Sequence, residues 1–417
     1  HLPELVGVIE TESEQSGAVR RGGTRVSSVG ATGRLKLAAV VGGALVLVGI
    51  AVFQLGWFNT NETAPVVTGR SGVARGGSNL AKIENLLKKD RLTDIARRAT
   101  RLEPIAERQE PIDLNARLAL ARLYCDLGTR FGMAGSGMKM GGLITALSAN
   151  KILGNAIDIV RACSALHQGK LPQANNYLNR HIKAMDIEAL LVGMLVAGSQ
   201  KDVDVVTQRY DLAKEAGTKK HGETYQARIN FSAGRAYEAA EAFEKSYAAF
   251  VAVTDQDSTR ADAWLGQARV KWALLDEGDD EESLLAPIEE ALFRAEREIE
   301  LLGTQKRWAA EVYQTLGEVQ LRRSDYRAAA RRMESALKYL PKDTKLLARI
   351  ARTLRLGGSF DGSMKYWERI LQVDPHSEVG IVGLADVFIQ TAAYERGTVR
   401  VSELISGKRA TPAMVFW

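Results

Sequence analysis

Hydrophobic residues are distributed along this chain in two different ways. Between Leu37 and Phe53 every residue is apolar or glycine. From about residue 80 onward, apolar residues instead recur at spacings of three and four among charged ones, which is the period of an amphipathic helix. The pattern predicts an all-α chain in which one hydrophobic segment near the N-terminus precedes many amphipathic helices.

The apolar segment Leu35–Phe58 is long enough to cross a membrane. Extending the uncharged run from Leu37 to Phe58 gives about 22 residues, or roughly 33 Å of helix at 1.5 Å per residue. Trp57 and Phe58 lie at its end, where aromatic side chains favour the boundary between lipid and water. A buried helix of a soluble core rarely has this length without a charge. We therefore expect a single transmembrane helix that contacts the lipid bilayer.

Basic residues flank this segment unequally. They are Arg20, Arg21, Arg25, Arg34 and Lys36 before it, and within a similar distance Arg70 and Arg75 after it. The positive-inside rule then places residues 1–34 in the cytoplasm and the C-terminal part in the periplasm, across the inner membrane. A cleaved signal peptide is the alternative, but its apolar core is shorter and a small-residue cleavage site follows it, which Asn59–Pro65 matches poorly.

The segments on either side of the predicted span have the composition of unstructured chain. Residues 11–34 are rich in serine, glycine, threonine and charge without an apolar period, so we expect 1–34 to be a disordered tail. Residues 59–79 have the composition of a flexible linker, whose ends would lie roughly 25 Å apart on average. A short tail is expected at 410–417.

Toward the C-terminus, large and small apolar residues return in a fixed order every 34 positions. The first copy comprises Leu316, Gly317, Tyr326, Ala329, Met333, Ala336 and Pro341; counterparts follow at Ile350, Ala351, Phe360, Ser363, Trp367, Ile370 and Pro375, then at Leu384, Ala385, Tyr394, Gly397, Val401 and Leu404. Small residues beside large ones allow two antiparallel helices to pack closely. One such pair cannot cover its apolar face alone, so neighbouring pairs must stack.

This order of residues resembles the tetratricopeptide repeat (TPR). Tyr313 stands where the family often has tryptophan, and Met333 fills the bulky position; both are compatible in size. The resemblance implies an α-solenoid of helix pairs that follows the transmembrane helix, as in membrane-anchored TPR proteins. Regular repeats are expected over 310–409, repeats with an insertion over 227–309, and degenerate ones over 80–226. A plain helical bundle is the alternative for residues 80–220.

Composition and motifs indicate few candidate residues for catalysis or for binding metals, phosphates or nucleic acid. A net charge of +6 over 417 residues does not favour nucleic-acid binding. The five histidines have no paired metal spacing, and no residue stands in a nucleophile motif. The glycine-rich segment Gly132–Gly142 lacks the Lys-Ser/Thr ending of a phosphate loop, so we interpret it as a mobile loop. We expect no enzymatic activity, no cofactor and no metal.

Two cysteines, Cys125 and Cys163, fall in the predicted first helices of neighbouring units. If the repeats lie outside the cytoplasm, both cysteines enter an oxidising compartment. We therefore predict a disulfide between them, with two free thiols as the alternative. Cys163 and His167 lie four residues apart, which we interpret as a packing pair, because two ligands do not make a zinc site.

The TPR resemblance implies that first helices line a concave groove that binds peptides or partner helices. The basic residues predicted to line it are Arg228, Arg235, Arg322, Lys345, Arg352 and Arg355. We interpret them as a partly basic groove for an acidic segment, with ordinary solvated charge as the alternative. Glu318 and Arg352 stand where peptide-clamp members of the family have asparagine, so a chaperone-tail clamp is not expected.

Together these features predict a non-catalytic, membrane-anchored TPR scaffold that binds partner proteins in a bacterial cell-envelope assembly. Secretion, pilus, motility and envelope-biogenesis machines all fit this description. Two alternatives stay open: a chaperone-like accessory of a translocon, and a regulatory subunit of an envelope enzyme. In each case the expected partners are other proteins within a multi-subunit membrane complex, and no nucleic-acid partner is expected.

Overall fold

The computed structural model describes most of the chain after residue 91. The described ranges are 92–107, 113–148, 157–221, 225–275, 281–299 and 306–406. The predicted tail, membrane span, linker and C-terminal tail (1–34, 35–58, 59–79 and 410–417) lie outside these ranges. Within them, no helix combines the length and apolar character needed to cross a membrane.

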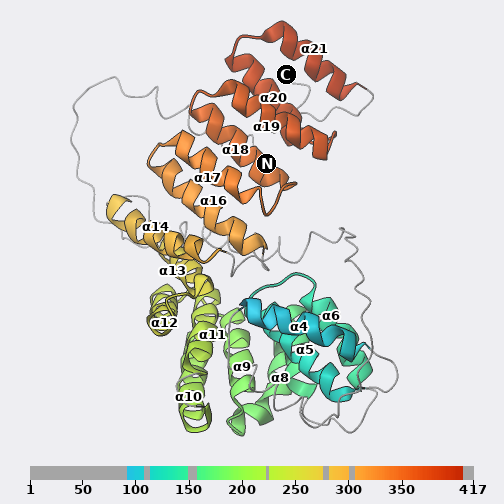
Figure 1. Cartoon of the computed structure of the whole chain (residues 1–417), viewed down its shortest axis with the longest axis vertical. Helices are drawn as coiled ribbons and strands as arrows, with labels where there is room; N and C mark the ends of the chain where they lie inside the picture. Colours follow the sequence, from blue (N-terminus) through green and yellow to red (C-terminus); the bar gives the residue numbers. More distant parts are fainter. Residues whose placement is uncertain are drawn as a thin grey trace, which may run out of the picture. The chain divides into compact units, whose positions relative to one another are not determined.

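The described residues form helices and no strands, which confirms the predicted all-α class. The helices are α4 (Leu92–Ala106), α5 (Leu114–Thr129), α6 (Ser136–Ser148), α7 (Asp158–His167), α8 (Leu171–Lys183), α9 (Ile187–Ser199), α10 (Val203–His221), α11 (Gln226–Ala239), α12 (Phe243–Gln256), α13 (Ala261–Ala273), α14 (Glu281–Arg297), α16 (Lys306–Arg322), α17 (Tyr326–Ala336), α18 (Thr344–Leu356), α19 (Phe360–Val373), α20 (Glu378–Gln390) and α21 (Tyr394–Ile405). Each helix packs against the next one along the chain (Figure 1).

The helix boundaries at the C-terminal end match the 34-residue period of the sequence. The second helices α17, α19 and α21 begin at Tyr326, Phe360 and Tyr394, which are 34 residues apart. The first helices α18 and α20 begin at Thr344 and Glu378, again 34 residues apart. The pairs α16–α17, α18–α19 and α20–α21 are therefore successive units of a TPR-like array.

Large side chains pack against glycines on neighbouring first helices, as the repeated order of sizes predicts. Phe250 of α12 is fully buried and lies between Gly234 of α11 and Gly266 of α13. A Cβ atom on Gly234 would lie 2.8 Å from the ring, and one on Gly266 would lie 2.7 Å from it. Only glycine leaves room for the ring at both positions, so the two first helices approach the same aromatic side chain.

The turn between the two helices of a pair has the same backbone conformation in six pairs. Each of six residues stands two positions before a second helix with φ between 54° and 74°; they are Gly169, Lys201, Glu241, Ser324, Gly358 and Ala392. The next residue donates its N–H to the carbonyl five positions back, as Asp325 does to Gln320 at 2.9 Å. This is a Schellman-type ending of the first helix.

The shared turn extends into the part of the chain where the sequence pattern is weakest. Gly169 and Lys201 adopt it between α7 and α8 and between α9 and α10. Met185 adopts the same conformation before the first helix α9, so residues 157–221 share this turn with the C-terminal units both within and between helix pairs. A plain bundle, the alternative for residues 80–220, does not require this turn.

One interpretation of the sequence is wrong. Gly132–Gly142 was expected to be a mobile loop, but α6 begins at Ser136 and includes the rest of that segment. Met140 and Leu147 lie seven residues apart on α6 and are both fully buried. Their burial stabilises the helix more than its glycines, at about 1 kcal/mol each relative to alanine, destabilise it.

Candidate protein-interaction face

The first helices of successive pairs contact one another and form a common surface. Helix α9 packs on α11, α11 on α13 and α13 on α16, while α18 packs on α20. The ion pair between Arg349 of α18 and Glu318 of α16 joins the two groups. We call the surface formed by α9, α11, α13, α16, α18 and α20 the first-helix face. Arrays of this kind typically bind partners on such a surface.

The chain itself covers the upstream part of this face. Phe131, in the turn after α5, is fully buried, and its ring stacks on Phe231 of α11 with centroids 5.4 Å apart. The same ring lies 5.9 Å from that of Trp308 on α16. The guanidinium of Arg130 lies 5.6 Å from the Phe231 ring and is 1% exposed. The upstream first helices are therefore in contact with the α5–α6 turn.

Arg228 was predicted to line an open groove, and this prediction is wrong. Its side chain is 2% exposed and forms ion pairs with Asp126 of α5 at 2.9 Å and Glu188 of α9 at 2.6 Å. Tyr225 donates a hydrogen bond to the same Glu188. The repeat position of Arg228 does face the first-helix surface. It is buried because α5 packs over that surface.

Arg235 of α11 is partly buried in a second group of charges. Its guanidinium pairs with Glu238 at 2.6 Å, and Glu238 also accepts a hydrogen bond from Arg269 of α13 at 2.8 Å. Both guanidinium groups lie over the ring of Trp308, at 5.8 and 5.2 Å from its centroid. Glu311 of α16 lies 3.5 Å from Arg269. Arg235 thus joins helices within the array and presents little free charge.

Burial and neighbouring charges oppose each other in this second group. Burial raises the pKa of the Glu238 carboxyl, but Arg235 and Arg269 beside it bring the pKa below its ordinary value. Burial lowers the pKa of Arg235, and Glu238 offsets part of that decrease. The group therefore stabilises the packing of α11, α13 and α16 in its ionised form.

The downstream part of the face, on α16, α18 and α20, is open. Lys345 and Arg352 of α18 are exposed, and neither has an ion-pair partner among the described residues. The Arg352 guanidinium lies 5.9 Å from the Trp367 ring. Arg355 pairs with Asp386 of α20 at 3.3 Å, and Arg322 lies over the Trp272 ring at 5.2 Å. These four of the six predicted residues lie on first helices with exposed or half-buried side chains.

Three exposed apolar side chains on α18 and α20 were not predicted from the sequence. Leu356 is 54% exposed, Val379 is 45% exposed and Ile389 is 39% exposed. Val379 occupies the same repeat position as Lys345, 34 residues later, and Ile389 the same position as Arg355. An apolar residue at a repeat position that carries a cation in the preceding unit is the signal that identifies them.

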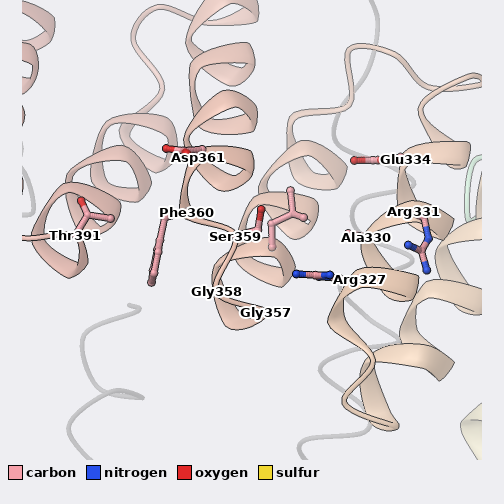
Figure 2. Close-up of a pocket in the computed structure, with 11 residues that line it drawn as sticks. Arg327, Ala330, Arg331, Glu334, Gly357, Gly358, Ser359, Phe360, Asp361 and Thr391 are labelled. Carbon is pink, nitrogen blue, oxygen red and sulfur yellow. The ribbon is translucent and has the colours of Figure 1, made fainter.

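A second candidate is an open cleft of about 680 Å³ beside α17 and the turn before α19. Figure 2 shows Arg327 and Arg331 of α17 near this turn, which includes Ser359, and Asp361 of the first turn of α19 also lines the cleft. Glu334, also in the cleft, accepts a hydrogen bond from Tyr366 at 2.8 Å. Burial and this hydrogen bond raise the pKa of Tyr366 to about 12. The cleft carries charges of both signs and its lining is more polar than apolar, so it is the weaker candidate for binding a protein.

Cys125 of α5 and Cys163 of α7 are joined by a disulfide, with Cα atoms 5.5 Å apart. His167 follows one turn later on α7, and its ring lies against Gly128 of α5. Within the described ranges, no three histidine, cysteine or acidic side chains lie close enough together to hold a metal ion. These residues therefore connect helices in the structure.

Comparisons with known proteins give similarities of fold only. No protein-family model matches the sequence, and no curated protein matches it. Similar crystal structures include the apo form of RapI, with 11% identity over 70% of this chain and 84% of that chain, at a TM-score of 0.45. A Rap protein complexed with Competence and Sporulation Factor has 13% identity over 78% of this chain and 95% of its own, at a TM-score of 0.43.

MamA is a third similar structure, with 13% identity over 41% of this chain and 92% of that chain, at a TM-score of 0.33. All three TM-scores lie below 0.5. The assignment of a TPR-like helical array therefore depends on the helix pairs, their spacing and their shared turn.

Proposed function

We propose that this protein is a non-catalytic scaffold, anchored in a membrane by Leu35–Phe58, that binds a partner protein on the downstream first-helix face. The observation that supports this proposal is the combination of exposed apolar side chains with Lys345 and Arg352, which lack acidic partners among the described residues. A surface that only needs to be soluble does not require large apolar side chains such as Leu356 and Val379 to be exposed on α18 and α20.

The chemistry of this face indicates the kind of partner. Leu356, Val379 and Ile389 offer apolar area, and removing such area from water contributes about 25 cal/mol per Å². Lys345 and Arg352 offer positive charge, which accelerates association with an acidic partner and orients it. The face therefore suits an amphipathic segment that carries carboxylates beside its apolar side chains.

The length of the apolar segment and the excess of cations before it support the location that we propose. The array would extend into the periplasm from a single inner-membrane helix, with the linker 59–79 between them. A bacterial envelope assembly is the proposed setting, and its partner is identified by chemistry alone. Protease protection in spheroplasts tests this topology: cleavage of residues 92–406 only after the outer membrane is opened is expected, whereas full protection would contradict it.

The binding face is tested by reversing the charges of Lys345 and Arg352, which have no ion-pair partner within the described part of the chain. Lys345→Glu with Arg352→Glu should reduce the amount of each stoichiometric partner that co-purifies from detergent extracts at least tenfold. The matched control is Arg327→Glu with Arg331→Glu, which makes the same charge change in the cleft beside α17 and should leave capture unchanged. Loss of partner capture in the control alone would show that the partner binds in the cleft beside α17 and not on the first-helix face.

Three different outcomes distinguish the scaffold from a translocon accessory and from a regulatory subunit. A scaffold retains one or a few partners at fixed stoichiometry, and a translocon accessory instead crosslinks transiently to many unfolded chains. A regulatory subunit would alter the activity of one envelope enzyme when Lys345 and Arg352 are reversed.

A further inference from the structure

The turn after α5 is seated on the first-helix face as a bound segment would be. Phe131 lies 100 residues before Phe231 and stacks on it, with ring centroids 5.4 Å apart. Its second aromatic contact, Trp308, belongs to a helix still further along the chain. Contacts this distant in sequence do not arise from the pairing of successive helices. They arise because α5 and its turn lie on the face formed by α11 and α16.

The site that receives Phe131 combines aromatic rings with guanidinium groups. Arg260 lies over Phe231 at 5.1 Å and is held by Asp262 through two hydrogen bonds of 2.8 Å. Arg228 receives the Asp126 carboxylate of α5, as described above. The turn thus supplies one aromatic ring, and α5 supplies one carboxylate five residues earlier. Rings and guanidinium groups placed in this way are typical of sites that bind aromatic side chains.

A covalent link holds α5 close to this site. Cys125 lies on α5 one residue before Asp126, and its disulfide partner Cys163 lies on α7, which packs against α9 of the first-helix face. His167 of α7 further fixes the register, because a Cβ atom on Gly128 would lie 2.0 Å from its Nε2 atom. With the disulfide intact, α5 cannot move far from α7, so Phe131 remains on the face.

We propose that the α5–α6 turn is an internal ligand of the upstream first-helix face, held there by the Cys125–Cys163 disulfide and released when that disulfide is reduced. Release would uncover the Phe231 and Trp308 rings and remove the Asp126 carboxylate from Arg228, which would still pair with Glu188 and lie over the Tyr225 ring. The uncovered site would accept an external segment with an aromatic side chain and, about one and a half turns of helix before it, a carboxylate.

The reducing step needs a dithiol, and because Cys163 is 0% and Cys125 4% exposed, the dithiol reaches their sulfurs only when α5 and α7 separate locally. The dithiol donates two electrons and two protons, the bond between the Cys125 and Cys163 sulfurs breaks, and each sulfur leaves as a thiol. The dithiol itself becomes a disulfide. Release of the α5–α6 turn does not depend on the proposed partner of the downstream face, because the turn and the upstream first-helix face belong to the same chain.

Hydrogen exchange measured by mass spectrometry tests the inference on the full-length protein in detergent, with and without dithiothreitol. Reduction should increase exchange at least tenfold in α4–α6 and in the first turns of α16 around Trp308. Exchange in α18–α21 should change less than twofold. The double variant Cys125→Ser, Cys163→Ser should show the reduced pattern without dithiothreitol and no further response to it.

A matched pair of core variants distinguishes a ligand from an ordinary core residue. Phe131→Ala should reproduce the local increase in α4–α6 and α16. Phe250→Ala, which removes an equally buried ring inside the array, should instead raise exchange in α11–α13. Unchanged exchange after both thiols have become alkylatable would overturn the proposal. A common increase in the hydrogen-exchange rate across α4–α14 in every variant would also overturn the proposal, because Phe131 would then be part of a single cooperative core.

Discussion

Arg228 of α11 and Asp126 of α5 form an ion pair in which Nη2 and Oδ2 are 2.9 Å apart, although 102 residues separate them in the chain. Both side chains are buried. Removing one partner of a buried pair costs about 3–5 kcal/mol where the remaining charge has no other partner, but the Arg130 guanidinium also lies 3.7 Å from Asp126 and compensates part of its charge. Arg228→Met should therefore lower the stability of the upstream helices by up to about 3 kcal/mol, measured as a shift in urea unfolding followed by circular dichroism.

The control for this change is Arg355→Met. Arg355 pairs with Asp386 at 3.3 Å, but both side chains are partly exposed, and pairs of that kind contribute about 0–1 kcal/mol. Equal shifts for the two variants would contradict the importance of the buried pair.

The carboxyl of Glu238 should contribute to the pH dependence of stability. Its folded-state pKa lies below the ordinary value of 4.5 because of Arg235 and Arg269, even though burial acts in the opposite direction. Its contribution is therefore complete above pH 4.5 and is lost as the pH falls through the folded-state pKa. Glu238→Gln should lower stability at pH 7 and flatten the acid limb of a plot of unfolding free energy against pH.

Arg269→Met tests whether Arg269 causes the lowered pKa of the Glu238 carboxyl. Without Arg269 the Glu238 carboxyl loses one of its two cationic neighbours, so the further effect of Glu238→Gln should shrink. An unchanged effect would show that Arg269 does not lower the pKa of Glu238.

The turn between paired helices should respond to glycine in a predictable direction. Ser324 and Ala392 have φ of 59° and 54°, a conformation that costs a residue with a Cβ atom about 1 kcal/mol. Ser324→Gly and Ala392→Gly should each raise the thermal midpoint. Gly358→Ala should lower it, since Gly358 has φ of 74° and no atom within 4 Å of an added Cβ, so that strain alone decides the outcome. Stabilisation by Gly358→Ala would contradict the turn argument.

Gly383 of α20 should be intolerant of alanine. A Cβ atom there would lie 2.4 Å from the Trp367 ring of α19, and overpacking of this kind costs about 1–3 kcal/mol. Gly383→Ala should destabilise the last two pairs in urea unfolding, and Trp367→Leu should relieve the effect.

Gly142→Ala on α6 is the matched control for Gly383→Ala. No atom lies within 4 Å of its added Cβ, so the change should stabilise that helix by up to about 1 kcal/mol through helix propensity. Equal effects of the two substitutions would show that Trp367 does not constrain Gly383.

The sequence predicts the parts of this fold that follow from the order of large and small residues along the chain. Tyr326, Phe360 and Tyr394 begin three second helices at the spacing that the pattern of sizes requires. A residue that faces the first-helix surface can likewise be recognised from its repeat position. Whether that surface is open cannot be recognised in this way, because Arg228 and Lys345 are both basic residues on first helices, yet only Lys345 is exposed.

The difference between Arg228 and Lys345 comes from a contact that no repeat encodes. Phe131 lies in a turn outside the regular units, and nothing in its neighbourhood indicates that it stacks on Phe231. The helical state of α6 was missed for a related reason, since its glycines suggest a loop and the burial of Met140 and Leu147 stabilises the helix.

The position of Phe250 between two glycines has a consequence for the whole array. Because one ring touches Gly234 of its own pair and Gly266 of the following pair, its width sets the step from one pair to the next. A change of side-chain volume at this single residue alters that step and is carried to every later pair. The distance between two anchoring points on a long ligand is thus adjustable by substituting a residue that never touches the ligand.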